Sequence, residues 1–187
     1  MPVDRAALGR DAREVAPYLL NKVVGHGAVT GRIVEVEAYR GSDDPGSHAY
    51  RGPTPRTQVM FGSAGFAYVY FTYGMYWCMN VVVGPEGTAS AVLIRALAPI
   101  GGIDTMFERR PKAHKTKDLC SGPAKLCQAL DVDGRFDGHD LAEDPLLLLD
   151  DGTPPPAEPS VSARIGLSRG LDLPWRWYVS GDPNVSR

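Results

Sequence analysis

Short runs in which apolar and polar residues alternate recur along the first half of the chain, and this period-two pattern is typical of half-buried strands. The clearest run is RIVEVEAY, residues 32–39. Two aromatic and β-branched runs, residues 67–73 and 76–83, are separated only by Gly74 and Met75, which predicts a β-hairpin. Further strands are predicted at residues 90–96, 164–167 and 175–179.

Helical spacing of apolar residues is confined to three segments. These predicted helices cover residues 11–22, 102–110 and 121–131, and Pro123 suits the first turn of the last one. Residues 40–57 are rich in Gly, Pro, Ser and Asp and are predicted to form a loop. Because short turns join the strands, we predict an α+β fold: a single compact domain over residues 1–187, with a curved, mostly antiparallel sheet, flanking helices and a protruding hairpin.

Length and composition are those of a soluble globular domain. The chain has 187 residues, of which 43% are hydrophobic and 22% charged. No apolar run approaches the roughly 20 residues of a membrane span, and the first residues lack the apolar stretch of a secretory signal. We therefore expect a cytoplasmic protein, nucleoid-associated if the source is bacterial. We also expect a monomer, because no long amphipathic repeat is present.

Cysteine and histidine give no sign of a metal site. The three cysteines, Cys78, Cys120 and Cys127, cannot all pair, and their spacing is not that of a zinc site. We interpret them as buried free thiols. With only four histidines and neither HExxH nor CxxC, neither a metal nor another cofactor is expected.

The overall charge argues mildly against a nucleic-acid partner, but the distribution of charge along the chain weakens that argument. The net charge is −2 and the pI about 6.1, whereas binding to phosphates needs Lys and Arg. Nine acids lie between Asp131 and Glu158. A basic face and an acidic face are possible, and so is a solvated helix beside an acidic loop. The basic residues cluster earlier, at Arg109, Arg110, Lys112, Lys115, Lys117 and Lys125.

Alternation along residues 32–39 brings two carboxylates to one face of a strand. Val34, Val36 and Ala38 are assigned to the core, and the opposite face then carries Ile33, Glu35, Glu37 and Tyr39. Like charges so placed repel each other, which a protein tolerates when one has a function or when both reach solvent. The residues alone favour neither of these two interpretations.

The hairpin supplies aromatic rings and an amide. With the turn centred near Gly74-Met75-Tyr76, Tyr70 is predicted opposite Asn80 and Tyr68 opposite Val82, while Tyr73 and Tyr76 lie at the tip. An exposed aromatic tip is expected to insert into a partner. The alternative is a well-packed hairpin without a ligand, and His48 in the preceding loop can equally be a solvated histidine.

At these residues the sequence resembles the alkyladenine (3-methyladenine, methylpurine) DNA glycosylase family. The resemblance spans roughly residues 20–167 and is carried, in family order, by GRIVEVEAYRG, SHAYRGPTPRT, MFGSAGFAYVYFTYGMYWCMNVVV, AVLIRALAPI, SGPAKLCQAL and RIGLS. It implies a monofunctional hydrolase that initiates base excision repair. Such an enzyme flips an alkylated or deaminated purine (3-methyladenine, 7-methylpurines, hypoxanthine, ethenoadenine) out of double-stranded DNA and cleaves its N-glycosidic bond.

The resemblance also implies a role for each matching residue. Glu37 falls on the general base that activates water, and Arg95 on an arginine beside it. Asn80 falls on the amide that screens out guanine, and Tyr73 on the side chain wedged into the duplex. Tyr39, His48 and Tyr70 fall on groups around the flipped base, and Thr54, Arg56 and Lys125 fall near phosphate contacts.

Elementary chemistry agrees with this reading. Aromatic faces attract cationic purines, by on the order of 1–2 kcal/mol when desolvated, and the absence of lysine from these segments favours direct attack by water. Two alternatives remain: a non-catalytic protein that binds damaged DNA, and a hydrolase of free nucleosides. The presence of Glu37 and Arg95 argues against a protein that only binds damaged DNA, because binding alone does not need them. Tyr73 distinguishes a hydrolase of free nucleosides, because such an enzyme has no use for a wedge at the hairpin tip.

Overall fold

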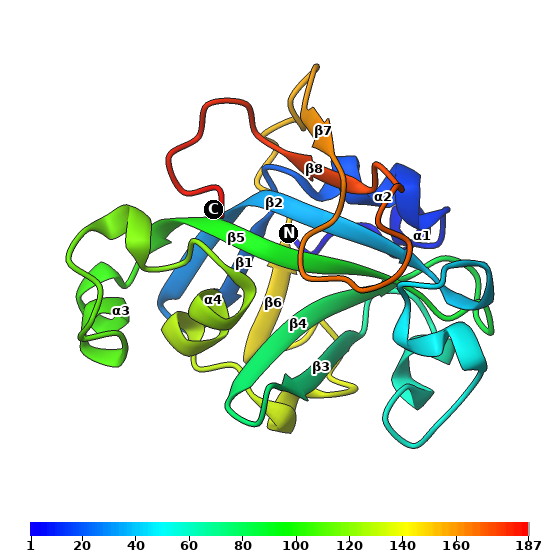
Figure 1. Cartoon of the computed structure of the whole chain (residues 1–187). Coiled ribbons are helices and arrows are strands. Elements are labelled where there is room, and N and C mark those ends of the chain that lie inside the picture. Colours follow the sequence, from blue (N-terminus) through cyan, green and yellow to red (C-terminus); the bar gives the residue numbers. More distant parts are fainter. Residues whose placement is uncertain (187) are drawn as a thin grey trace.

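One mostly antiparallel sheet organises the chain, and the computed structural model describes residues 1–186 (Figure 1). This confirms the predicted α+β class. The α-helices are α1 (Arg5–Leu8), α2 (Ala12–Leu19), α3 (Ile103–Arg109) and α4 (Pro123–Leu130). The strands are β1 (Val23–His26), β2 (Val29–Arg40), β3 (Ala67–Thr72), β4 (Tyr76–Val83), β5 (Ser90–Gly101), β6 (Leu146–Leu149), β7 (Ser160–Ser162) and β8 (Arg176–Tyr178).

The long strand β2 lies at the centre of the sheet. The strand order is β3-β4-β5-β2-β1-β6, and β8 pairs with both β2 and β7. On the edge of β2 away from β5, β1 pairs with residues 29–32 and β8 with residues 35–37. Residues near the end of the chain are thereby brought beside the two carboxylates of β2.

The two faces of the sheet have different surroundings. Val36, Ala38, Ile94 and Met79 belong to the main hydrophobic core, which also contains the buried residues of α2 and α4. The opposite face, which carries Glu35 and Glu37, is covered by the loop of residues 41–66 and by the segment after β7. The short 3-10 helices in that loop are η1 (Gly41–Asp43), η2 (His48–Arg51) and η3 (Gln58–Phe61); η4 (Thr116–Asp118) and η5 (Gly134–Phe136) come later.

Helix boundaries follow their local sequence signals. The side chain of Asp11 caps α2 by accepting a hydrogen bond from the backbone N–H of Arg13. Pro123 occupies the first turn of α4, as predicted, where its missing N–H costs nothing. None of the helices within residues 1–186 is long and apolar enough to span a membrane.

Three local predictions were wrong. Residues 164–167 form a loop, not a strand. Ile33 packs in the main core and not on the carboxylate face, because a β-bulge between Ile33 and Glu35 reverses the alternation. The hairpin turn is Tyr73-Gly74-Met75, so Asn80 pairs with Tyr68 and not with Tyr70. This register differs from the prediction by two residues, so every side chain keeps its face.

Candidate active site

A row of side chains crosses four strands on the carboxylate face. Glu37 of β2 pairs with Leu93 of β5, Leu93 pairs with Asn80 of β4, and Asn80 pairs with Tyr68 of β3. Paired residues of neighbouring strands share a face. The sheet therefore supplies a rigid floor on which a carboxylate, an amide and a phenol lie in line.

Glu37 is fully buried and is held by two hydrogen bonds and one ion pair. Its Oε2 accepts a hydrogen bond from the hydroxyl of Tyr39 at 2.7 Å. Its Oε1 accepts one from the backbone N–H of Ile165 at 2.7 Å and lies 3.2 Å from Nη1 of Arg95. The interpretation of Glu35 and Glu37 as two solvated acids is wrong, because neither has any exposed surface. A buried carboxylate persists only with such partners.

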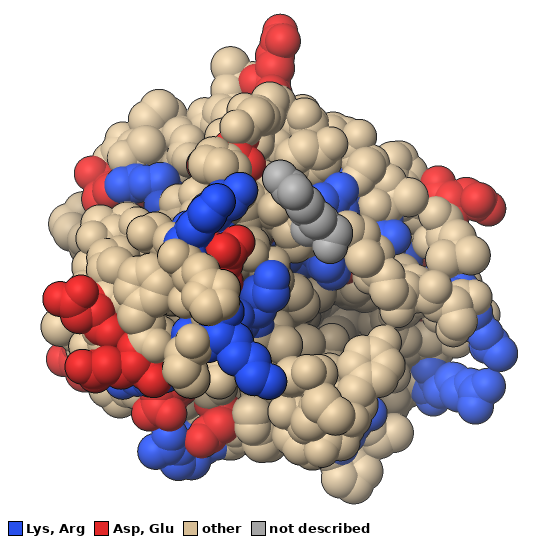
Figure 2. All heavy atoms as spheres, turned by 60° about the vertical axis from the view of Figure 1, so that its left-hand side comes forward, with Lys and Arg blue, Asp and Glu red and all other residues tan. Residues whose placement is uncertain are grey.

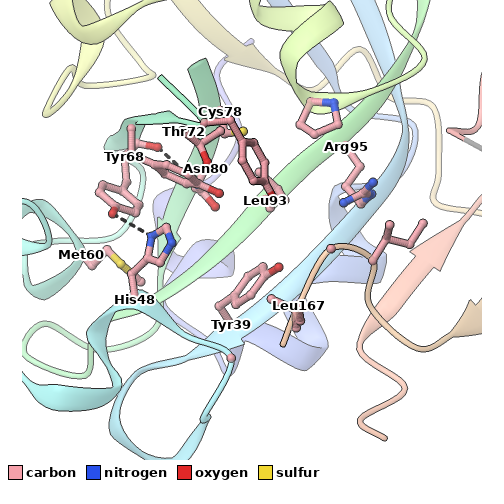
Figure 3. A pocket seen from close by; sticks show the side chains of 16 residues that line it. Tyr39, His48, Met60, Tyr68, Thr72, Cys78, Asn80, Leu93, Arg95 and Leu167 are labelled. Atoms are coloured by element: carbon pink, nitrogen blue, oxygen red, sulfur yellow. Dashed lines mark hydrogen bonds between the residues drawn. The ribbon is translucent and has the colours of Figure 1, made fainter. Parts of the chain in front are cut away.

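All three partners of Glu37 also line a cavity of about 300 Å³. The carboxylate thus lies directly behind the cavity wall that Tyr39, Arg95 and Ile165 form. Ile165 is 39% exposed, so the loop that carries it forms the part of the cavity wall nearest to solvent. Figure 3 shows Tyr39 on β2 and Arg95 on β5, with the loop of Leu167 beside them.

A cluster of aromatic rings, in edge-to-face and tilted contact, forms the far side of the cavity (Figure 3). The centroids of His48 and Tyr70 are 4.5 Å apart and those of Tyr68 and Tyr70 are 5.4 Å apart. Nδ1 of His48 lies 3.1 Å from the hydroxyl of Tyr68. Desolvation, reinforced by the charge of Arg56, lowers the pKa of His48 to about 4. Burial raises the pKa of Tyr68 to about 12 and that of Tyr70 further, so all three rings are neutral near pH 7.

Asn80 has a fixed orientation. Its Nδ2 donates to the backbone carbonyl of Tyr68 at 3.0 Å, and because a carbonyl can only accept, the nitrogen must face it. The side chain is nearly inaccessible yet borders the cavity. It can therefore discriminate between ligand atoms by their hydrogen-bonding character.

Guanidinium groups lie over two of the cavity tyrosines. Arg164 lies 4.6 Å from the ring centroid of Tyr39, and Arg56 lies 5.2 Å from that of Tyr70. Arg164 is itself buried and forms two short contacts with Asp44, at 2.6 and 2.7 Å. This pair anchors the loop that presents the N–H of Ile165 to Glu37.

Tyr73 lies at the tip of the β3–β4 hairpin and borders the cavity. It is 79% exposed and has a φ of +52°, in the left-handed region. The structure therefore brings together Glu37, Arg95, Tyr39, His48, Tyr70, Asn80 and Tyr73.

The three predicted phosphate-contact residues lie outside the cavity lining. Thr54 shares reciprocal hydrogen bonds with Thr57 in a local turn. Lys125 lies in α4 next to Pro123, which does line the cavity, and it borders a separate hollow of about 140 Å³ with Lys117. In Figure 2 the hollowed face carries Lys and Arg on several sides of the hollow.

Sequence reasoning found Tyr39 and Arg95 but missed the other partners of the two carboxylates, which are the Ile165 N–H on Glu37 and Arg176 and Ser186 on Glu35. It also missed Arg164 and the position of Tyr68. Arg164 lies in the RIGLS motif but far along the chain from its partner Asp44. Tyr68 was expected opposite Val82 instead of Asn80, although alternation along β3 does place it on the face of Tyr70. Among residues 1–186, no group of three or more His, Cys, Asp or Glu side chains is arranged to hold a metal ion.

Comparison with known proteins identifies the family. The family model for methylpurine-DNA glycosylase (MPG) matches residues 6–183. A relative from Burkholderia cenocepacia is 52% identical over 98% of this chain and 90% of its own. One from Streptomyces avermitilis is 48% identical, with coverage of 99% and 91%, and one from Carboxydothermus hydrogenoformans is 48% identical, with coverage of 91% and 88%. Each carries the name "Putative 3-methyladenine DNA glycosylase".

The chain belongs to the methylpurine-DNA glycosylase family. This confirms the resemblance seen in the sequence motifs and places the protein among the DNA repair glycosylases, which are hydrolases.

Proposed function

We propose that this protein is a monofunctional DNA glycosylase that flips damaged purines out of duplex DNA and hydrolyses their N-glycosidic bond with water activated by Glu37. The observation that carries the proposal is the setting of Glu37. It is a buried carboxylate whose three donor partners all line an aromatic cavity. Its proposed substrates are 3-methyladenine, 7-methylpurines, hypoxanthine and ethenoadenine.

The chemistry needs one free position on Glu37. A carboxylate has about four lone-pair sites. Two hydrogen bonds and the ion pair with Arg95 face three of them here. Because Glu37 has no exposed surface and lies behind the cavity wall, part of that wall must shift when DNA binds to admit a water to the fourth site, on Oε2. This water gives its proton to Glu37 while its oxygen bonds to C1′ of the sugar. The C1′–N bond breaks and its electron pair leaves with the base. Arg95 and Glu37 fix the geometry, and the carboxylate stabilises positive charge that develops on the sugar.

The cavity suits a single flipped base. Its volume of about 300 Å³ lies at the small end of ligand sites. Tyr39 and Tyr70 supply ring faces for stacking, and His48, neutral at physiological pH, contributes an edge. Asn80 at the cavity wall excludes guanine in this proposal by a steric clash with its 2-amino group. None of the cavity residues within the described chain is a lysine, which supports hydrolysis over Schiff-base chemistry.

The charge around the rings bears on the choice of base. Arg164 and Arg56 already engage Tyr39 and Tyr70, and their positive charge opposes that of a cationic purine in the cavity. Cation–π attraction is therefore weaker than bare tyrosine rings would provide. In this proposal most of the binding comes from stacking, which is available to neutral hypoxanthine and ethenoadenine as well as to cationic purines.

Duplex recognition is assigned to the exposed groups around the cavity. Tyr73 fills the space that the extruded base leaves, as wedging side chains do in other DNA-bending proteins. Thr54, Arg56 and Lys125 contact phosphates. With a net charge of −2, the protein depends on these local contacts, so its affinity should fall steeply with salt.

The test is base release from a panel of duplexes, each with one lesion, under single-turnover conditions. We expect free base to appear while the strand stays intact until it is treated with alkali. Release of no base from any duplex would overturn the proposal. Strand cleavage without alkali would overturn its monofunctional part. A matched Tyr73→Ala variant should lose activity on duplex DNA, whereas a hydrolase of free nucleosides would be unaffected.

A further inference from the structure

Glu35 is a second fully buried carboxylate on the face that carries Glu37. Burying an ionised carboxylate costs several kcal/mol unless it is paired. In the proposed reaction Glu35 touches neither the water nor the base. Its burial next to Glu37 therefore calls for a separate explanation.

Four donors bind Glu35, three of them on the same oxygen. Its Oε1 accepts from Nε of Arg176 at 2.6 Å, from the hydroxyl of Ser186 at 2.8 Å and from Nε of Arg95 at 3.0 Å. Its Oε2 accepts from the backbone N–H of Ser186 at 2.6 Å. Pairing of β8 with β2 brings Arg176 to this place. Glu35 has no exposed surface and does not line the cavity, so it cannot bind a ligand directly and acts on its neighbours.

Arg95 is the neighbour that connects Glu35 to the site. Its Nε is held by Glu35, its Nη2 lies 3.4 Å from the hydroxyl of Ser186, and only Nη1 faces Glu37. Arginine commonly pairs with a carboxylate through two parallel N–H groups. Here that arrangement is prevented, because two of the three guanidinium nitrogens are already engaged.

We propose that Glu35 is a positioning residue for base hydrolysis: by holding Nε of Arg95, it restricts Arg95 to a single contact with Glu37 and keeps one lone-pair site of Glu37 open for the attacking water. This inference rests on the proposed function. Without the hold of Glu35, Arg95 turns to pair with both oxygens of Glu37. The fourth site, on Oε2, is then filled and the water is displaced.

Charge balance adds to the geometric effect. Glu35 and Glu37 are matched by Arg95 and Arg176, so the cluster is neutral. Loss of the charge on Glu35 leaves two guanidinium groups facing one carboxylate, which makes Glu37 a weaker base. Raised pKa values keep the nearby tyrosines and the cysteine neutral between about pH 5 and 8. The titratable and charged groups that face Glu37 are Glu35, Tyr39, Tyr70, Cys78, Arg95, Arg164 and Arg176.

The experiment compares single-turnover rates on a hypoxanthine duplex across pH. Glu35→Gln keeps the shape and removes the charge. We expect the rate to fall about 10- to 100-fold, duplex affinity to change less than about threefold, and the acid limb of the rate–pH profile to move to lower pH by about one unit. Glu35→Asp, which restores the charge, should return the acid limb to its original position.

Ser186→Ala is the matched structural control. It removes the hydroxyl that donates to Glu35 and accepts from Nη2 of Arg95, but it removes no charge. Its rate can fall, but its acid limb should stay in place. If Glu35→Gln fails to fold, the double variant Glu35→Gln, Arg176→Met keeps the cluster neutral, and its rate should still fall about tenfold. A wild-type rate in either folded variant, or a slower rate of Glu35→Gln with an unmoved acid limb, would overturn the inference.

Wild type and Glu37→Gln are measured alongside these variants. If wild type releases no base, the proposed function fails. If wild type is active, Glu37→Gln is inactive and Glu35→Gln is normal, only the role of Glu35 fails. The two failures are therefore distinguishable.

Discussion

Replacing Tyr73 with asparagine should make the protein more stable and less active on duplex DNA. Tyr73 has a φ of +52° at the hairpin tip. The left-handed conformation costs a side-chain-bearing residue roughly 1–2 kcal/mol, and asparagine pays much less. The ring is 79% exposed, so about a fifth of it is buried. Since full burial of such a side chain is worth about 1.5–3 kcal/mol, about 0.5 kcal/mol is lost.

The net expectation is a gain of about 0.5–1 kcal/mol in the free energy of unfolding. For a domain of this size, the gain corresponds to a rise of about 1–4 °C in melting temperature. Tyr50→Asn is the control, because Tyr50 is exposed in η2 without a positive φ. That variant should show no stabilisation.

Activity should move in the opposite direction. Unstacking a base from the duplex costs a few kcal/mol, and the wedged ring offsets part of this cost. A loss of about 2 kcal/mol corresponds to a rate roughly 30-fold lower. The assay is single-turnover release of hypoxanthine from a duplex and from the same single strand, which needs no wedge. Equal losses on both substrates would contradict the role of Tyr73 as a wedge. A less stable variant would contradict the strain assigned to its positive φ.

Two further predictions concern pH and salt. The pKa of His48 is about 4 in the folded protein, below its ordinary value near 6.5, so the unfolded chain binds more protons and stability should fall as pH drops through this window. His48→Gln should lose less stability than wild type between about pH 7.5 and 5 in denaturant titrations, and equal losses would contradict this. Arg56→Gln and Lys125→Gln should each reduce the slope of log Kd for duplex against log salt by about 0.9. Arg10→Gln, which changes a residue that packs on Tyr18 of α2 on the other face of the sheet, should leave the slope unchanged.

Alternation along single strands was enough to predict much of the site. The period of two placed Glu35, Glu37 and Tyr39 on one face, and the hairpin signal placed Tyr73 at a tip. These features depend on local geometry, which a short stretch of sequence encodes. The hairpin register was wrong by two residues, because the turn is centred on Gly74 and not on Met75, and a single glycine does not fix which residue is central.

Contacts between distant parts of the chain could not be predicted. Ser186 reaches Glu35 and the Ile165 N–H reaches Glu37 only because β8 and its flanking loops return to the edge of β2. Neither a hydrophobic pattern nor a residue type indicates such a return. The sequence also gives no signal for the bulge beside Ile33, which places this residue in the main core.

The single-turnover rate of Glu37→Gln on a hypoxanthine duplex tests the central claim most directly. Glutamine keeps the volume of glutamate but cannot take a proton from water. We predict that this variant releases the base at least about 100-fold more slowly than wild type, with duplex affinity within about threefold. Release at the parental rate would show that another group activates the water and would contradict the account.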